Sequence, residues 1–228
     1  MSRLLVIAFA VLGVLIHAAR ARVSARARGT LPLHLRSTLE RLGPPFVKLG
    51  QALSLRRDLL PDDITEALQG LQDDVKPFPG ADAQREVERE LGRPLDEVFR
   101  EFEQKPFAAA SIAQVHRAWL LDGREVVVKV RRPHIRAQID RDMRLLMLVL
   151  RCLGPVVPIL RRYDAVALAR EIWTRLQAET NLRQEALNVR RFVDAFRDHP
   201  LVEVPDVEEA LCTDRRDGAG IQPWPAHR

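Results

Sequence analysis

Cysteine is scarce in this sequence, and neither cysteine nor histidine occurs in a metal-binding pattern. The two cysteines, Cys152 and Cys212, are far apart and form no CxxC motif. The six histidines include no HExxH pattern. Short, fixed spacings of these residues are the sequence signatures of zinc sites and of disulfide-rich scaffolds. The sequence therefore indicates neither a metal site nor a disulfide framework.

Acidic residues are absent from the first part of the chain. Glu40 is the first of them, and the five arginines of residues 1–28 account for the whole formal net charge of +5: Arg3, Arg20, Arg22, Arg26 and Arg28. A nucleic-acid groove needs a basic face within the folded part of a protein. Because residues 29–228 have no net charge, the sequence does not favour nucleic acid as a partner.

Charge is also absent from the segment Leu4–Ala19, which is apolar along its whole length. It is somewhat shorter than the roughly 20 residues of an average span, which tilting can accommodate. More arginines follow it than precede it, and this predicts a single-span N-terminal anchor with the remaining domain on the cytoplasmic side of the membrane. A signal peptide is the alternative, although signal peptides carry their charges before the apolar run.

Residues 30–79 have the pattern of amphipathic helices. Pro44-Pro45 is typical of a helix start, and one apolar stripe follows from spacings of four, three and four: Leu42, Phe46, Leu49 and Leu53. Lys48 and Gln51 lie together off this stripe, where a solvated polar face is their simplest interpretation. A short helix is expected after Pro61, and residues 80–104 give a broken helical pattern.

A β-hairpin is predicted within residues 105–133. Asp122-Gly123 supplies a tight turn, and the run of valines that follows it contains Lys129. An ammonium group among valines needs an anionic partner, which could be a protein carboxylate, a phosphate or both. The alternative is a lysine on a half-exposed strand whose ammonium group reaches water.

Glycine is missing where a nucleotide-binding kinase carries its phosphate loop, just before such a hairpin. The residues found there are Ala108, Ala109, Ala110 and Ser111. Alanine does not adopt positive φ cheaply, so this loop should be stiffer than a glycine loop. Ordinary packing of small residues explains the same run equally simply.

The second half of the chain is mainly helical. One helix is expected over 138–150 and a single long helix over 164–197. Glu179 fills a gap in the apolar stripe of the long helix, and Glu185 lies at its edge, so either carboxylate could meet Lys48 or Lys129. A polar residue satisfied by a backbone group is the alternative for Glu179.

Four motifs in this order resemble the UbiB/AarF family of atypical protein-kinase-like proteins, over about residues 30–205. They are KLGQ at 48–51, PFAAASIAQVHRA at 106–118, VVVKVRRP at 126–133 and ETNLRQEA at 179–186. The resemblance implies an α+β fold: a kinase-like N-lobe with a small antiparallel sheet, and a helical extension that lays the KxGQ helix across the active site.

The resemblance also implies roles for individual residues. Lys129 resembles the strand lysine that holds nucleotide phosphates, and Glu185 its helix glutamate. The loop 108–111 resembles the nucleotide loop. Lys48 and Gln51 resemble the KxGQ residues that obstruct protein substrates, and Glu179 and Asn181 fall on the family's ExD motif. ATP and Mg²⁺ are the implied cofactors, and membrane lipids, quinone intermediates and quinone-biosynthesis proteins the implied partners.

Two features depart from the family pattern. Asn181 stands where ExD has its aspartate, which weakens that position as a magnesium ligand. The catalytic-loop Asp and Asn and the Asp-Phe-Gly of a second lobe are not found after His199, so we expect no ATP turnover by this chain alone. We expect an irregular tail over 211–228, from a truncation or a frameshift near 211–217.

The expected organisation is therefore an anchor and basic arm over 1–28, a helical KxGQ extension over 29–104, the kinase-like lobe over 105–210 and the tail. The expected function is that of a membrane-attached UbiB-like kinase or ATPase that supports ubiquinone biosynthesis. The alternative is a non-catalytic membrane or lipid adaptor with a residual nucleotide lobe. Saturable nucleotide binding separates the two hypotheses.

Overall fold

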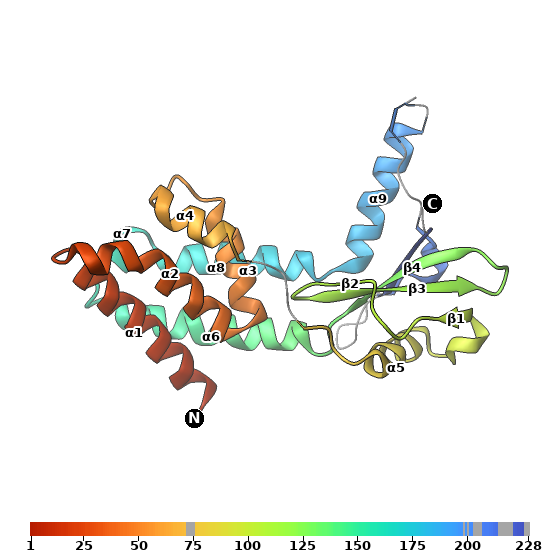
Figure 1. Cartoon of the computed structure of the whole chain (residues 1–228), viewed down its shortest axis with the longest axis horizontal. Coiled ribbons are helices and arrows are strands. Elements are labelled where there is room, and N and C mark those ends of the chain that lie inside the picture. Colours follow the sequence, from red (N-terminus) through yellow and green to blue (C-terminus); the bar gives the residue numbers. More distant parts are fainter. Residues whose placement is uncertain (72–75, 198, 200, 203–206, 214–220, 226–228) are drawn as a thin grey trace. The chain divides into compact units, whose positions relative to one another are not determined.

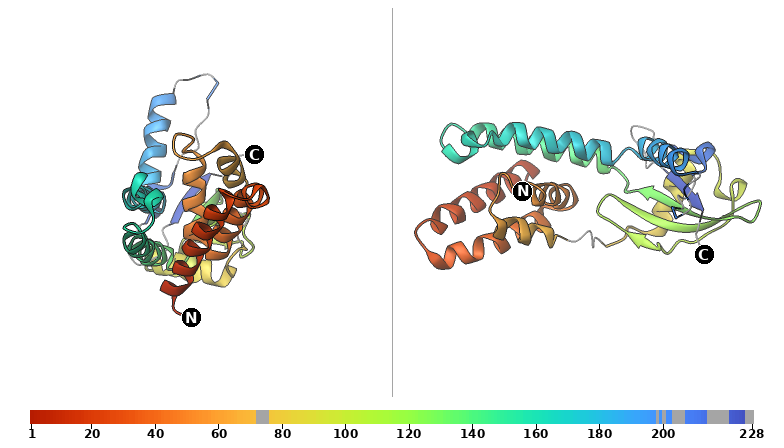
Figure 2. Two further views of the ribbon diagram at one scale, coloured as in Figure 1. Left: turned by 90° about the vertical axis from the view of Figure 1, so that its left-hand side faces the viewer. Right: turned by 90° about the horizontal axis from the view of Figure 1, so that it is seen from above.

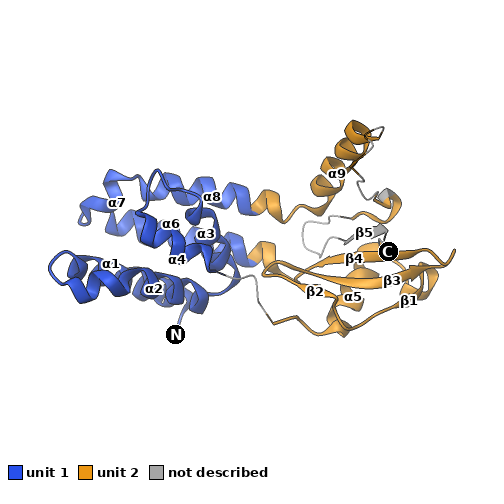
Figure 3. Ribbon diagram, turned by 45° about the horizontal axis from the view of Figure 1, so that its top comes forward, with its two compact units in different colours: residues 1–73, 138–176 blue, residues 74–137, 177–228 orange. Residues whose placement is uncertain are grey.

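A computed structural model describes residues 1–71, 76–197, 199, 201–202, 207–213 and 221–225. The chain divides into two compact units, shown in Figure 3. Unit 1 comprises residues 1–73 and 138–176, and unit 2 comprises residues 74–137 and 177–228. Residues 80–104 belong to unit 2, together with the sheet, and the functional boundaries expected at 28, 104 and 210 stay a prediction.

Unit 1 is built from helices. Its first two, α1 (Arg3–Ala21) and α2 (Ala25–Leu42), are joined by a short turn and lie side by side (Figure 1). Helix α3 (Pro44–Ser54) begins at the predicted proline pair, and α4 (Asp62–Gln69) follows. Most of α6 (Ile135–Leu153) and α8 (Ala165–Glu179), with the short α7 (Pro158–Arg162) between them, completes the unit.

Helix α1 is the one helix within the described residues that is long and apolar enough to cross a membrane. Its mean hydropathy is 2.2, and only 11% of its apolar window is buried inside the protein. Ile7 is fully buried, whereas four side chains spaced along another face are exposed: Leu5, Phe9, Leu12 and Ile16. The predicted apolar helix is therefore confirmed, and one of its apolar faces is exposed.

Unit 2 contains an antiparallel sheet with the order β1-β3-β4-β5, and β2 also pairs with β3. The strands are β1 (Phe99–Phe102), β2 (Ala108–Ala109), β3 (Ala113–Leu120), β4 (Glu125–Arg131) and β5 (Ile221–Pro225). The predicted hairpin is confirmed as β3 and β4 (Figure 2), with Gly123 at φ 87° in its turn. Glycine suits this position because it adopts positive φ without steric cost.

Two strands lie where the sequence predicted none. Strand β1 occupies part of 80–104, which had given only a broken helical pattern, after α5 (Gly80–Leu91). Strand β5 lies in the segment predicted to be irregular and pairs with β4. Its sequence contains Pro223 and Pro225, which hide a strand from pattern analysis because proline cannot complete a ladder.

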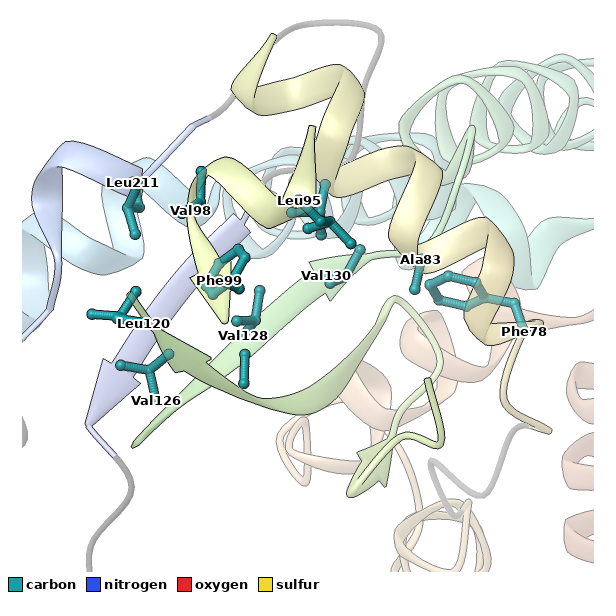
Figure 4. Packing of buried hydrophobic residues seen from close by; sticks show 12 residues of the cluster. Phe78, Ala83, Leu95, Val98, Phe99, Leu120, Val126, Val128, Val130 and Leu211 are labelled. Carbon is teal, nitrogen blue, oxygen red and sulfur yellow. The ribbon is translucent and has the colours of Figure 1, made fainter. Parts of the chain in front are cut away.

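The core of unit 2 lies between α5 and one face of the sheet (Figure 4). Alternate residues of β4 point into it, as expected for a strand with one buried face. The three that do so are at most 1% exposed: Val126, Val128 and Val130. Phe99 of β1 and Leu120 of β3 meet them across the sheet.

The single long helix predicted over 164–197 is wrong. The structure has two helices, α8 and α9 (Leu182–Phe196), separated at Thr180 and Asn181. Asn181 is the N-cap of α9, and its side chain accepts a hydrogen bond from the Gln184 backbone N–H at 2.9 Å. Asparagine competes well with a continuous helix because its side chain satisfies an N–H at a helix start.

Candidate functional site

Lys129 lies on the face of β4 opposite the three core valines. Residues 125, 127 and 129 are half-buried, whereas 126, 128 and 130 are buried. The composition of the strand suggested a lysine enclosed by valines, but the valines that form the core point to the other face. Its side chain is 30% exposed, so its ammonium group can meet both protein groups and a ligand from solvent.

The predicted anionic partner of Lys129 is Glu185 of α9. The lysine Nζ donates to both carboxylate oxygens of Glu185, at 2.8 Å each. The Glu185 side chain is 33% exposed. Charge-assisted contact with both oxygens fixes the direction of the lysine side chain, because movement away from either oxygen weakens one of the two bonds.

The break between α8 and α9 positions Glu185. Since α9 starts after the Asn181 cap, Glu185 falls in its first turn. A carboxylate there is stabilised by the unpaired N–H groups and the positive end of the helix dipole. Position 181 therefore has a structural role that asparagine fills as well as the aspartate of the ExD pattern would.

Two arginines hold the backbone at this break, and sequence reasoning missed both. Arg131, at the end of β4, donates to the Thr180 carbonyl at 2.7 Å, and Arg136 donates to the same carbonyl at 3.0 Å. Arg131 is only 1% exposed and is the largest fully buried side chain. The sequence signal was the Arg131-Arg132-Pro133 run, which directly follows the buried valines. An arginine buried at this position needs several hydrogen-bond acceptors, so it indicates a polar contact with another segment.

The alanine-rich segment forms the turn and short strand beside β3. Ala108 pairs with Val115, and Val115 pairs in turn with Lys129, so the segment is one strand removed from the lysine strand. The Ala110 N–H donates to the Ala113 carbonyl at 2.8 Å and closes the turn. The structure thus places the predicted loop in the same sheet as Lys129.

Ser111 is completely buried, unlike its neighbour Ala108, which is exposed. Its carbonyl accepts a hydrogen bond from the Arg132 guanidinium at 3.2 Å. A side chain with no exposed surface cannot contact a ligand without movement of the turn. Ser111 would therefore contribute to a site through the shape of the turn, and the alanines through their small size.

Glu179 ends α8 and is exposed, and its proposed role in the ExD motif stays a prediction. Glu179 interrupts the apolar stripe because α8 ends at this residue. The stripe of α8 is therefore not continuous with that of α9. Within the described residues no group of three or more His, Cys, Asp or Glu side chains is arranged to hold a metal ion. A magnesium ion here would depend on nucleotide phosphates for most of its ligands.

Lys48 and Gln51 lie on α3 in unit 1, both half-buried. Gln51 donates through Nε2 to the Leu71 carbonyl at 3.0 Å, so it is not simply a solvated side chain. A side chain at Gly50 would overlap Leu71 and Leu39, because α3 packs closely there. The glycine of the KLGQ sequence is therefore explained by packing. The placement of Lys48 and Gln51 at the active site stays a prediction.

A buried polar network supports the sheet beneath the alanine turn. His116 donates through Nδ1 to the Glu103 carbonyl at 2.8 Å, and its Nε2 accepts from the Gln114 amide at 2.8 Å. Gln114 in turn bonds the backbone of Phe78. Burial lowers the pKa of His116 below its usual 6.5, against a smaller raising effect of Glu103. The imidazole is therefore held neutral.

The chain is similar to known proteins over most of its length. Residues 70–216 match the model of the ABC1 atypical kinase-like domain. A probable protein kinase UbiB from Vibrio cholerae is 44% identical over 181 residues, which are 79% of this chain and 33% of that protein. A probable protein kinase UbiB from Marinobacter nauticus is 41% identical over 198 residues, 84% of this chain and 36% of that protein.

One solved structure supports the same similarity. It is the complex of Rv3197 from Mycobacterium tuberculosis with erythromycin, which matches with a TM-score of 0.50 at 29% sequence identity. The match covers 91% of this chain and 51% of that one. This chain spans about a third of the length of the curated relatives it matches.

Proposed function

Because this chain belongs to the ABC1 family of atypical kinase-like proteins, we propose that it binds the phosphates of ATP or ADP through Lys129. In this proposal the protein is part of a membrane-attached, UbiB-like kinase or ATPase that supports the biosynthesis of ubiquinone or a related isoprenoid quinone. Family membership rests on the ABC1 match over residues 70–216. Nucleotide binding, the role in quinone biosynthesis and the membrane attachment are proposed in addition to family membership.

The Lys129–Glu185 ion pair is the single observation that supports nucleotide binding most strongly. Kinase-like proteins use a strand lysine, oriented by a helix glutamate, to hold nucleotide phosphates. Here the strand lysine contacts both oxygens of the helix glutamate at 2.8 Å, and about a third of each side chain is exposed. A phosphate can therefore approach the ammonium group while Glu185 keeps it in position.

When bound, Mg²⁺ would neutralise phosphate charge, and the described residues supply few candidate ligands for it. Glu179 and Asn181 are the residues of this chain that fall on the ExD pattern. Asn181 would offer an amide oxygen in place of a carboxylate, which predicts weak dependence of nucleotide affinity on Mg²⁺. Helix α1 is the proposed site of membrane attachment, since it is long and apolar enough to cross a membrane and one of its apolar faces is exposed.

Titration of the purified chain with a fluorescent ADP analogue, with and without Mg²⁺, tests the proposal. We expect saturable binding that weakens at least about tenfold in Lys129→Ala, since a charge-assisted contact to phosphate is lost. Glu185→Gln should weaken binding less, because it removes the orienting charge and leaves the ammonium group. The matched control is Lys105→Ala, which removes an exposed lysine of the same unit.

Equal affinities of Lys129→Ala and Lys105→Ala would show that the strand lysine does not contact the nucleotide. Absence of saturable binding by the wild-type chain would favour the second candidate, a non-catalytic membrane adaptor that retains a residual nucleotide lobe. The exposed apolar face of α1 is the observation that favours this alternative.

A further inference from the structure

Arginines gather at one end of unit 1. The turn between α1 and α2 and the segment that contains α7 lie at this end (Figure 3). The end is formed by residues 20–30 and 151–164, which together contain seven arginines and a single acidic residue, Asp164. Asp164 accepts a hydrogen bond from the Ala167 N–H at 3.1 Å at the start of α8. We refer to residues 20–30 and 151–164 as the arginine end.

Three of these arginines line one pocket. It has a volume of about 490 Å³ and is lined by Arg22, Pro158, Ile159, Arg161 and Arg162. Arg22 comes from the α1–α2 turn and the other two from the end of α7, far away in sequence. None of the three guanidinium groups forms an ion pair within the part of the chain that the structure describes. Converging guanidinium forks match the oxygens of a phosphate group.

Exposed apolar side chains lie beside these arginines. Val23 is 89% exposed and Val156 is 73% exposed, while Ile159 and Tyr163 are each 43% exposed. Aliphatic side chains next to arginines suit the boundary between lipid headgroups and acyl chains, where tyrosine is also favoured. Single-stranded nucleic acid is held instead by aromatic side chains that stack on bases, and it gains nothing from exposed valines.

We propose that the arginine end is a membrane contact in its own right, with the phosphate of an anionic phospholipid headgroup in the pocket of Arg22, Arg161 and Arg162. The apolar side chains beside it enter the outer part of the bilayer. This contact deepens the membrane attachment of the proposed function by a second site, separate from α1, and it requires neither nucleotide nor Lys129. It also adds lipid selectivity, which an apolar helix alone does not provide.

Binding of the whole chain to vesicles of phosphatidylcholine, alone or mixed with phosphatidylglycerol, tests the site. The readout is the ratio of the two dissociation constants, because insertion of α1 contributes equally to both. Each arginine near an anionic surface contributes several-fold, so Arg22→Ala/Arg161→Ala/Arg162→Ala should reduce the preference for anionic vesicles on the order of a hundredfold. The same triple change to lysine should give an intermediate preference, since it keeps charge but loses the planar fork.

The matched control removes three exposed arginines of unit 2, Arg93, Arg100 and Arg183, and should leave the ratio near that of the wild type. An equal loss of anionic preference in this control, or a lysine variant as selective as the wild type, would mean that diffuse positive charge suffices. Either result would overturn the proposed headgroup site. Binding of inorganic phosphate without any vesicle preference would overturn the lipid as ligand. Displacement from anionic vesicles by single-stranded RNA would overturn it in favour of nucleic acid.

Discussion

Arg3 at the start of α1 forms a bidentate ion pair with Asp142 of α6, across 139 positions of sequence. The Arg3 Nε lies 3.0 Å from Asp142 Oδ1, and its Nη2 lies 2.5 Å from Oδ2 and 2.7 Å from the Leu42 carbonyl. The Asp142 side chain is completely buried. The apolar N-terminal helix is therefore attached to unit 1 at its first residue, in addition to its packing along α2.

Arg3→Ala should lower the free energy of unfolding by about 3 kcal/mol, because it leaves a buried carboxylate without its main partner. Arg141, whose Nε lies 3.4 Å from Asp142 Oδ1, moderates the loss. The measurement is urea unfolding followed by circular dichroism. Replacing both partners, as Arg3→Met with Asp142→Leu, should recover most of this stability, since no buried charge remains.

The control for this prediction is Arg26→Ala, which removes an exposed arginine of α2 and should change stability by at most about 0.5 kcal/mol. If Arg3→Ala and Arg26→Ala are equally mild, the ion pair does not hold α1.

Acidification should destabilise unit 2 through His116. Its pKa in the folded protein is below the value of 6.5 that applies when the chain is unfolded. Between these two values the unfolded state binds more protons, so the free energy of unfolding falls as pH is lowered through about 6.5. Protonation of Nε2 would also place two donors against each other, because the Gln114 amide group already donates to Nε2.

The matched variant is His116→Gln, which stays neutral throughout this range and keeps one donor and one acceptor. Unfolding free energies measured by urea titration between about pH 7.5 and 5 should decline less steeply in the variant. The pKa of His34 is also lowered, mainly by burial, but this residue is common to both proteins and cancels in the comparison. Parallel pH profiles would contradict the assignment.

Gly50→Ala should destabilise unit 1, although alanine favours helices. The added Cβ overlaps Leu39 and Leu71, which are 6% and 3% exposed and have no free space to enter. Overpacking of this kind costs about 1–3 kcal/mol, which exceeds the gain of about 1 kcal/mol in helix propensity. Chemical unfolding measures the difference. Gly13→Ala in α1 is the control, because a Cβ there contacts nothing; stabilisation by both substitutions would refute the close packing.

Asn181→Ala should cost about 1 kcal/mol, because α9 loses its N-cap bond to the Gln184 N–H. Asn181→Asp should stay within a few tenths of a kcal/mol of the wild type, since both side chains cap well. Differential scanning calorimetry distinguishes these outcomes. An alanine variant as stable as the wild type would show that Arg131 and Arg136 alone hold the break between α8 and α9.

The sequence by itself determined the local features of this protein. The apolar helix α1, the start of α3 at Pro44 and the turn at Gly123 follow from composition and from backbone preferences of neighbouring residues. Prediction from the sequence failed where two local tendencies compete. A continuous apolar periodicity outweighed the capping tendency of Asn181, so one helix was predicted in place of two. Prolines in β5 concealed a strand that forms only because β4 offers a partner.

The tertiary structure decided which charged groups meet. The residue pattern alone left open which of Lys48 and Lys129 meets a helical glutamate, and the family resemblance favoured Lys129 with Glu185. Folding brings this pair together across 56 positions. The sequence likewise gave no sign that Arg131 reaches the Thr180 carbonyl, or that Arg22 shares a pocket with Arg161. Contacts of this kind depend on the packing of distant elements, because the preferences of neighbouring residues do not specify which helices and strands come together.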